Sequence, residues 1–327
     1  MAAQKGNEKQ DKGWHHPWGT VYLNGKYVPG EQAVVSVLDI GFVKGDAVFD
    51  VCRTVRHKSY KLDEHVERFY KNLRYAKLDP GLTPEEMKQV CINVLEKSVH
   101  LLKENDEYWI FMRVTRGSNP YFPLNYVKGA KPTVVVYCVP IEFRNFAKQY
   151  RQGRRFITVS IRALPSECLE PRLKCGSRMH FMLAVAEAQE KDPEAHPLLL
   201  DINGNVAEPW GANIFIISKG KLMTPGKQLV LEGVTRETVL EIAGELKIPV
   251  IESNFIKLYD VYTADEAFVT TTSYKILPVQ SVDGVKVGTR IPGPITEQLT
   301  KAMSKKVGID LVEQAMSHLT AEERREL

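Results

Sequence analysis

Hydrophobic positions in the first part of the chain alternate with a period of two, which is typical of β-strands. Residues 20–28 alternate around Asn24-Gly25, the residue pair that most strongly signals a two-residue hairpin turn. Further apolar, β-branched runs follow at residues 47–55, 108–115 and 133–139. These runs predict a small sheet whose last two strands are joined by a loop rich in Gly, Pro and Asn.

Two segments within this part carry apolar residues at helical spacing instead. The first runs over residues 62–78, with Asp63 as a candidate N-cap. The second begins at Thr83-Pro84-Glu85-Glu86, which has the form of a capping box with proline in the first helical position. With the strands, these helices predict a small α+β domain over residues 20–139, preceded by a polar, flexible arm at residues 1–19.

A polar passage rich in Arg, Lys and Gln at residues 140–154 predicts a linker to a larger domain over residues 155–327. The expected fold class is α/β, of the α+β type, with two domains. The turns Asn203-Gly204 and Lys219-Gly220 favour antiparallel pairing of the strands within residues 197–224. The apolar runs of this domain predict strands at 156–162, 197–201, 213–218, 221–224 and 266–270, and helices at 177–190, 235–246 and 294–305.

Composition narrows the class of partner without selecting a function. The 327 residues carry 44 Lys and Arg against 40 Asp and Glu, a net charge of +4 that does not suggest a nucleic-acid partner. No apolar run is long enough for a membrane span, and the polar N-terminus lacks the apolar core of a secretory signal. Five cysteines without a C-x-x-C pair predict neither a disulfide framework nor a zinc site, so we expect a cytoplasmic protein. His15 and His16 could bind a metal, but without acidic neighbours we interpret them as surface chain.

Lys174 is the first candidate for chemistry, since the motifs of nucleotide-binding loops, zinc proteases and serine hydrolases are absent. It stands in apolar company directly before a helical pattern. Burial disfavours an ammonium group and lowers its pKa, which makes the amine a nucleophile able to form a Schiff base. The structural alternative is a lysine at a helix start that extends its ammonium group to solvent.

Three further features downstream suit the same chemistry. Glu208 lies at the mouth of an apolar strand, where a carboxylate could hold a pyridinium N–H. Gly233 and Thr235 stand at a helix start that favours a phosphate, although Thr235 could also be an ordinary N-cap. Thr271 and Thr272 belong to a hydroxyl run that is either an exposed strand end or a second phosphate contact. A Schiff-base lysine, a carboxylate and two phosphate contacts together describe a pyridoxal 5′-phosphate site.

From about Thr20 to about Val279 the chain resembles the class IV aminotransferases. This fold-type IV group contains branched-chain amino acid, D-amino acid and (R)-amine aminotransferases and aminodeoxychorismate lyase. The resemblance implies a small N-terminal α/β domain and a larger C-terminal domain with a barrel-like sheet core. It also implies a pyridoxal 5′-phosphate enzyme that moves an amino group from an amino donor to a 2-oxo acid with ping-pong kinetics.

The cofactor motifs of this family match the chain residue by residue. By the resemblance, Lys174 would carry the cofactor as a Schiff base and then move the proton, while Glu208 would hold the pyridine nitrogen. Pro209-Trp210, which follows Glu208, departs from the usual small residues, so the wall on the cofactor side is expected to differ. The remaining contacts would hold the phosphate: Arg68 in His65-Val66-Glu67-Arg68, then Gly233, Val234 and Thr235 in Gly233-Val234-Thr235-Arg236, and Thr271 and Thr272.

The residues that would select the substrate match the family less well. Phe49 and Arg53 resemble the F-E-G-x-R motif of the branched-chain enzymes, and Arg113 falls where those enzymes have an arginine, although Val51 replaces their glycine. Tyr121 lies in a loop that lacks the R-x-H pair of the D-amino acid enzymes. Arg53 and Arg113 could equally be structural ion-pair residues. We expect L-amino acids with apolar side chains, with (R)-amine or D-amino acid transamination as the alternative.

Two other functions, a lyase and a binding protein, and one assembly, a homodimer, are also considered. A lyase of the same fold, similar to aminodeoxychorismate lyase, would use the same Lys174 and Glu208, and a binding protein without catalysis is the alternative from another class. The resemblance implies a homodimer whose partner completes the site. The apolar loop Tyr121-Phe122-Pro123-Leu124 would cross to the partner, unless it packs on its own subunit. Cys175, beside Lys174, is interpreted as a packing residue.

Overall fold

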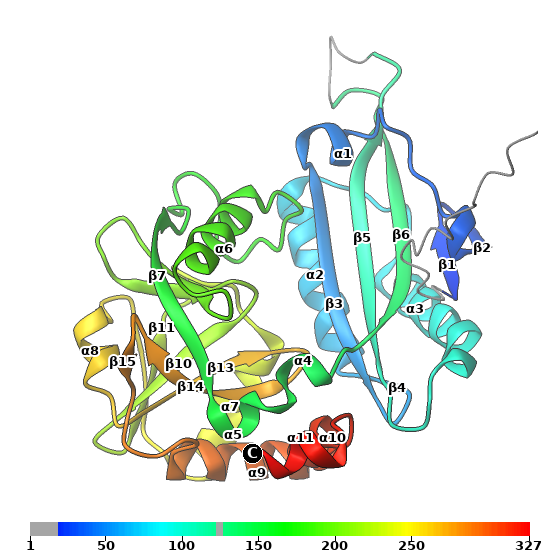
Figure 1. Cartoon of the computed structure of the whole chain (residues 1–327). Helices are drawn as coiled ribbons and strands as arrows, with labels where there is room; N and C mark the ends of the chain where they lie inside the picture. Colours follow the sequence, from blue (N-terminus) through cyan, green and yellow to red (C-terminus); the bar gives the residue numbers. More distant parts are fainter. Residues whose placement is uncertain (1–18, 122–126) are drawn as a thin grey trace, which may run out of the picture.

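A computed structural model describes residues 19–121 and 127–327 of the chain. Two β-sheets lie side by side, the first formed by residues 20–140 and the second by residues 154–286 (Figure 1). The predicted arm, with His15 and His16, and the loop residues Phe122 to Leu124 lie outside the described residues. Within the described part of the chain, no helix has the length and apolar character needed to cross a membrane.

The N-terminal sheet has six strands in the order β2-β1-β6-β5-β3-β4, and every neighbouring pair is antiparallel. Its first hairpin turns at Asn24-Gly25, as the sequence predicts. The strands are β1 (Thr20–Leu23), β2 (Lys26–Pro29), β3 (Ala47–Val55), β4 (Lys58–Tyr60), β5 (Tyr108–Ser118) and β6 (Lys131–Pro140). The helices of this part are α1 (Ile40–Lys44), α2 (Leu62–Ala76) and α3 (Pro84–Ser98), with 3-10 turns η1 (Gly30–Gln32) and η2 (Val99–Leu101).

Alternation along β3 and β5 divides their side chains between two faces of the sheet. One set is fully buried against α2 and α3: Val48, Cys52, Ile110, Met112 and Val114. The intervening residues are only half-buried on the opposite face: Phe49, Val51, Trp109, Phe111 and Arg113. Burial of each large apolar side chain contributes about 2 kcal/mol, and a slip of one residue would exchange the two faces. Packing under the helices therefore determines which side chains are left for the other face.

The C-terminal sheet has nine strands and mixed pairing, and it curves into a half-barrel (Figure 1). Its main path runs β12-β11-β10-β13-β14-β7-β8-β9, with β15 paired to β14. The hairpins β8–β9 and β10–β11 are antiparallel, as the turns at Asn203-Gly204 and Lys219-Gly220 predict. The strands are β7 (Arg154–Arg162), β8 (His196–Leu200), β9 (Val206–Pro209), β10 (Asn213–Ser218), β11 (Lys221–Pro225), β12 (Val250–Ser253), β13 (Glu266–Thr271), β14 (Lys275–Val282) and β15 (Val285–Lys286).

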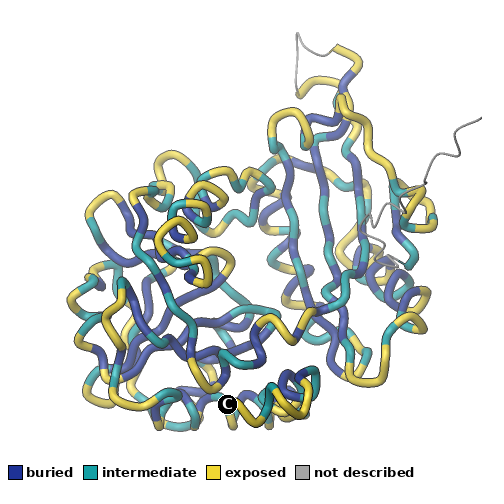
Figure 2. The backbone as a smooth tube through the Cα atoms, viewed as in Figure 1, coloured by how far each residue is buried: buried dark blue, intermediate teal, exposed yellow. Residues whose placement is uncertain are grey.

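Both faces of this sheet are packed, because successive residues of its central strands enter different cores. On β10, Ile214 and Ile216 join the core inside the half-barrel, whereas Phe215 and Ile217 pack under α7 (Val234–Glu245) and α9 (Pro294–Val307). Figure 2 shows buried backbone running through the strands of both sheets. The other helices are α4 (Arg144–Ala147), α5 (Gln149–Gln152), α6 (Met179–Lys191), α8 (Leu258–Tyr262), α10 (Leu311–Met316) and α11 (Ala321–Arg325).

The expected fold class is confirmed, but two local predictions are wrong. The domain bounds stay a prediction, and the predicted linker at residues 140–154 contains two short helices whose aromatic residues are buried in the C-terminal core. Asp63 is not the N-cap of α2, because Lys61 occupies that position in a left-handed conformation. Thr235 is not the N-cap of α7 either, since Gly233 precedes the helix. The capping box at Thr83 is confirmed.

Candidate active site

Lys174 is held by a short segment that pairs with the edge of β3. The Lys174 carbonyl accepts a hydrogen bond from the Phe49 amide at 3.0 Å, and the Gly176 amide donates to the Ala47 carbonyl at 2.6 Å. Cys175, between them, forms a β-bridge with Val48 and is buried, which agrees with a packing role. The backbone at Lys174 is therefore positioned by the N-terminal sheet, although it leads directly into α6.

The side chain of Lys174 lies over an aromatic ring, and among the described residues it forms no ion pair with an acidic group. Its Nζ is 4.7 Å from the centroid of the Phe49 ring. Burial, together with the positive charges of Arg178 and Arg68, lowers the pKa of Lys174 to about 7. The neutral amine, which is the form that attacks a carbonyl carbon, is therefore more abundant at pH 7 than in an ordinary lysine.

Glu208, on β9, is a second ionisable group whose environment shifts its titration. Burial raises the pKa of Glu208 to about 7, and Arg178 and the hydrogen bond from the backbone of Leu231 oppose that rise. The Leu231 amide donates to Glu208 Oε2 at 3.2 Å, while Asn213 Nδ2 donates to the Leu231 carbonyl at 2.9 Å. Within the described residues no cationic side chain forms an ion pair with Glu208, so its carboxylate suits a protonated ring nitrogen.

The N-terminus of α7 forms the opposite end of the same cavity. Gly233 is the N-cap and offers no side-chain cap, so the first helical N–H groups are open to a ligand. A Cβ at Gly233 would lie 2.2 Å from Asn213 Oδ1, so a larger residue would require the Asn213 side chain to move. Thr235 Oγ1 donates to the Thr271 carbonyl at 3.0 Å, which joins the helix to the end of β13. Thr272 lines the cavity beside them.

Arg68 lies on α2, which packs on the N-terminal sheet, and its side chain extends to the end of the cavity at the N-terminus of α7. Its Nε and Nη2 donate to the two carboxylate oxygens of Asp50 at 2.8 Å each, and Nη1 donates to the Glu232 carbonyl at 2.8 Å. His65 Nδ1 lies 2.7 Å from Asp50 Oδ1. Burial alone would raise the pKa of Asp50, but the charge of Arg68 and the hydrogen bond with His65 outweigh it and lower the pKa. Asp50 therefore fixes the orientation of the Arg68 guanidinium at all ordinary pH values.

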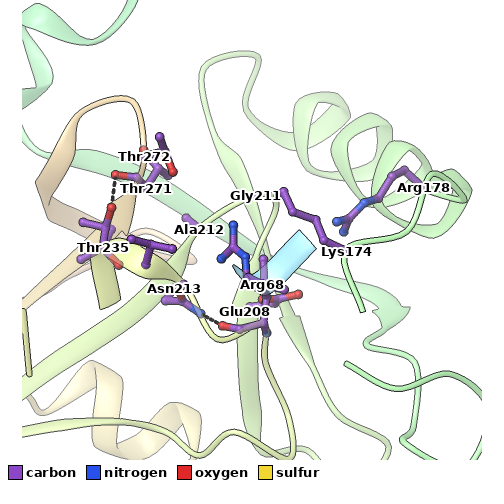
Figure 3. Close-up of a pocket in the computed structure, with 14 residues that line it drawn as sticks. Arg68, Lys174, Arg178, Glu208, Gly211, Ala212, Asn213, Thr235, Thr271 and Thr272 are labelled. Atoms are coloured by element: carbon purple, nitrogen blue, oxygen red, sulfur yellow. Dashed lines mark hydrogen bonds between the residues drawn. The ribbon is translucent and has the colours of Figure 1, made fainter. Parts of the chain in front are cut away.

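These groups fit pyridoxal 5′-phosphate in chemical type and in order. Figure 3 shows Lys174, Arg68 and Glu208 around one space, with Thr235 and Thr272 at its far side. The amine end, the carboxylate and the phosphate-binding end are thus separate positions along one cavity. Arg68 and the amides of Val234 and Thr235 would hold the phosphate, Glu208 the ring nitrogen, and Lys174 the aldehyde carbon.

A second cavity of about 430 Å³ opens from Lys174 between the two sheets. Its walls carry mainly aromatic and aliphatic groups: Phe49, Val51, Trp109, Phe111, Met182, Trp210 and Tyr274. Polar positions on its lining include Arg154, Arg178 and His196, and it also reaches Thr271 and Thr272. Trp210, which departs from the family pattern, lies here on the substrate side.

Three of the predicted substrate residues are not part of this lining. Arg53 is 1% exposed, and its Nη1 and Nη2 donate to the Ser273 carbonyl at 2.6 Å and to Gln314 Oε1 at 2.9 Å. Arg113 stacks on the Phe49 ring, with its Cζ 5.1 Å from the centroid. Tyr121 is 56% exposed at the border of the described residues. Phe49 and Val51 do line the cavity.

Sequence reasoning missed Trp109, Phe111 and Arg178. Alternation marks the two aromatic residues as one face of their strand, but their place beside Phe49 and Val51 depends on the pairing of β5 with β3. Arg178 could have been singled out as the charge four residues after Lys174.

Comparison with known proteins assigns the chain to a family. The family described as amino-transferase class IV matches residues 47–282. A protein of Methanocaldococcus jannaschii, provisionally named a branched-chain-amino-acid aminotransferase, is 37% identical over 280 residues, which cover 85% of this chain and 93% of that relative. The D-alanine aminotransferase of Bacillus licheniformis is 28% identical over 288 residues, which cover 88% of this chain and 96% of that relative.

Solved branched-chain aminotransferases share the fold. The Escherichia coli enzyme matches with a TM-score of 0.81 at 25% identity, over 88% of this chain and 94% of that one. The T.th. enzyme with pyridoxamine 5′-phosphate matches with a TM-score of 0.79 at 28% identity, over 89% and 94%. That enzyme has also been solved with N-(5′-phosphopyridoxyl)-L-glutamate and with 4-methylvaleric acid. This chain therefore belongs to the class IV aminotransferases, the pyridoxal 5′-phosphate-dependent transferases of fold type IV.

Proposed function

We propose that this aminotransferase takes L-amino acids with apolar side chains as donors and a 2-oxo acid such as 2-oxoglutarate as acceptor. The observation that carries the proposal is the apolar cavity beside Lys174, whose wall includes Phe49, Val51, Trp109 and Phe111. Among the described residues of this lining there is no carboxylate that could pair with a cationic side chain. An aliphatic side chain fits such a wall because its burial releases water from both surfaces.

The roles of the chain's own residues follow from their positions. When bound, the cofactor supplies an electron sink for the charge left at the substrate Cα. Lys174 provides a neutral amine at the junction of the two cavities, where it can remove and return the proton at Cα. Glu208 keeps a proton on the ring nitrogen, and Arg68 with the start of α7 holds the phosphate. The phosphate end would stay fixed during both half-reactions.

The relatives support this choice of substrate. The T.th. enzyme has been solved with a glutamate adduct of the cofactor and with an acid that has a branched aliphatic chain. D-alanine aminotransferases are similar at comparable identity, so handedness is the feature to test. A missing R-x-H pair in the loop before Tyr121 is the feature of this chain that favours L-amino acids over D-amino acids.

A donor panel with the holoenzyme tests the proposal. L-leucine, D-alanine and (R)-1-phenylethylamine are each mixed with the protein, and loss of the cofactor's visible absorbance is followed in a single half-reaction. We expect L-leucine to react about tenfold faster than the others. A faster reaction with D-alanine or with the amine would overturn the substrate assignment. Release of product without accumulation of pyridoxamine 5′-phosphate would identify a lyase instead.

We also infer a homodimer. The segment before β3 exposes Val34, Val37 and Phe42 at 75%, 71% and 75%, an unusual apolar surface for a free subunit. Tyr121, beyond the end of β5, is exposed as well. Sedimentation equilibrium at micromolar concentration should give twice the chain mass, and Phe42→Asp should lower that mass. A fully active monomer would contradict the inference.

A further inference from the structure

Arg178 stands at the junction of the cofactor cavity and the substrate cavity, and it contributes to the lining of both. Its guanidinium lies between two aromatic rings, with Cζ 5.4 Å from the centroid of Phe49 and 5.1 Å from that of Phe181. Throughout residues 19–121 and 127–327 no hydrogen bond or ion pair is formed by its side chain. The stacking leaves the N–H donors at the edge of the guanidinium plane unused.

The other arginines that line the two cavities are already engaged. Arg113 also stacks on Phe49 and its buried Nε has no partner among the described residues, but Arg113 is not part of either lining. Arg154 donates from Nε to Gln149 Oε1 at 2.7 Å and stacks on Tyr274. Arg53 is not part of the lining, and its guanidinium donates to the Ser273 carbonyl and to Gln314. Arg68 is held by Asp50 at the phosphate end. Arg178 is thus the cavity arginine whose donors are open and which shares an aromatic ring with the reacting amine, because Lys174 Nζ also lies over Phe49.

We propose that Arg178 binds the carboxylate of the amino acid or 2-oxo acid, and so makes the enzyme select substrates that carry a carboxylate next to the reacting carbon. The proposal rests on the proposed function, since it names the group that recognises those substrates. A guanidinium can bind both oxygens of a carboxylate in one plane, whereas an amine substrate without that group gains nothing from it. The apolar remainder of the substrate would then lie toward Trp109 and Phe111.

The geometry explains why the carboxylate would lie at Arg178 and the apolar part of the substrate elsewhere in the cavity. Lys174 Nζ and the Arg178 guanidinium both lie against Phe49, so a carbon that reacts at Nζ has Arg178 within reach of its own carboxylate. The two rings cover part of the guanidinium, and a lower local dielectric strengthens its attraction for an anion. Glu208 is the acidic group in the described lining of the cofactor cavity, and it forms no ion pair with Arg178, so it leaves the donors available.

The test measures equilibrium binding to the holoenzyme, without turnover. The probes are 4-methylpentanoate and 4-methylpentanamide, which have the same aliphatic chain but differ in charge, and binding is followed by titration calorimetry. The wild type should bind the acid about tenfold or more tightly than the amide. Arg178→Met should bind both alike, and Arg178→Lys should keep part of the preference because it keeps charge without the bidentate geometry.

Arg172→Gln is the matched control. Arg172 lies on the same segment, pairs with Glu170 at 2.7 Å and is more than half exposed, so its loss should leave the acid preference unchanged. An Arg178→Met protein that still prefers the acid would overturn the proposal. So would equal losses for acid and amide with a shifted cofactor absorbance maximum, since Arg178 would then act on the cofactor. If L-leucine is no substrate of the wild type while the acid preference depends on Arg178, the proposed function fails and this inference stands.

Discussion

The two ends of the site, which we propose bind the cofactor and the substrate, are stabilised in different ways. At the cofactor end, polar groups are oriented by further polar groups, as Arg68 is by Asp50 and Glu208 is by the Leu231 amide. At the substrate end, the wall is formed by half-buried residues such as Trp109 and Phe111, whose strand is positioned by packing on its other face. A substitution at the first end leaves a charge without its partner, whereas a substitution of an apolar wall residue at the second end changes only shape.

Because of this difference, the two ends of the site should tolerate different substitutions. Leaving a buried charge unpaired costs several kcal/mol, so the cofactor end tolerates few substitutions. A change of one methylene in an apolar wall costs about 1–3 kcal/mol, which alters substrate choice without loss of the fold. We therefore expect variants of the cofactor end to affect catalysis with every substrate, and variants of the substrate end to affect some substrates more than others.

Loss of Lys174 should have the largest effect. Lys174→Ala removes the amine that would attack the cofactor and move the proton at Cα, so turnover should fall by about three orders of magnitude or more with every donor. The visible absorbance of lysine-bound cofactor should disappear as well. Lys227, which is half exposed and lies near Glu232, provides the control, because Lys227→Ala should retain both properties. A Lys174→Ala protein with normal absorbance and rate would remove the basis of the mechanism.

Asp50→Asn should weaken the cofactor end next. It leaves the Arg68 guanidinium without its counter-charge, so the free energy of unfolding should fall by about 3 kcal/mol. The affinity for pyridoxal 5′-phosphate should fall by about tenfold, since Arg68 would no longer be oriented. Thermal melts and cofactor titrations measure the two effects. Asp63→Asn, on the helix that carries Arg68 but exposed and paired with Lys88, should change neither.

The pH dependence of cofactor capture tests the environment of Lys174. Its lowered pKa of about 7 means that the neutral amine is present at lower pH than in an ordinary lysine. The rate at which cofactor-free protein takes up pyridoxal 5′-phosphate should therefore rise by about tenfold from pH 6 to pH 8 and then level off. An unperturbed lysine would keep accelerating toward pH 10. A rate that still climbs steeply above pH 9 would show that the amine is not enclosed.

The two ends also differ in how far the sequence predicts them. Lys174, Glu208, Gly233 and Thr272 lie on local motifs, and the structure brings all four to one cavity because each lies at or near the end of a regular element. The antiparallel hairpins and the helix face of the N-terminal sheet follow from alternation and turn residues in the same way. Short-range sequence patterns are enough to predict site residues that lie at the ends of helices and strands.

The substrate end depends on which strands pair, and a single-sequence pattern does not contain that information. Trp109 and Phe111 face Val51 and its neighbours only because β5 pairs with β3 in the observed register. Likewise, the polar residues 140–154 gave no sign of the buried Phe146 and Tyr150. Arg53 shows the same limit, because its acceptors lie 220 and 261 residues further along the chain.

Arg53→Met should therefore have the smallest effect on substrate recognition. Its guanidinium holds the Ser273 carbonyl and Gln314, so its removal should lower the melting temperature, with a loss of about 3 kcal/mol of stability. The KM for L-leucine at a temperature where the variant is folded should stay within about twofold of the wild type, because a residue outside the lining removes no substrate binding energy. Trp109 Nε1 still donates to Ser273 Oγ at 3.0 Å and keeps that turn in place. A rise in KM of about tenfold with unchanged stability would place Arg53 at the substrate end after all, and the division between the two ends would have to be redrawn through β3.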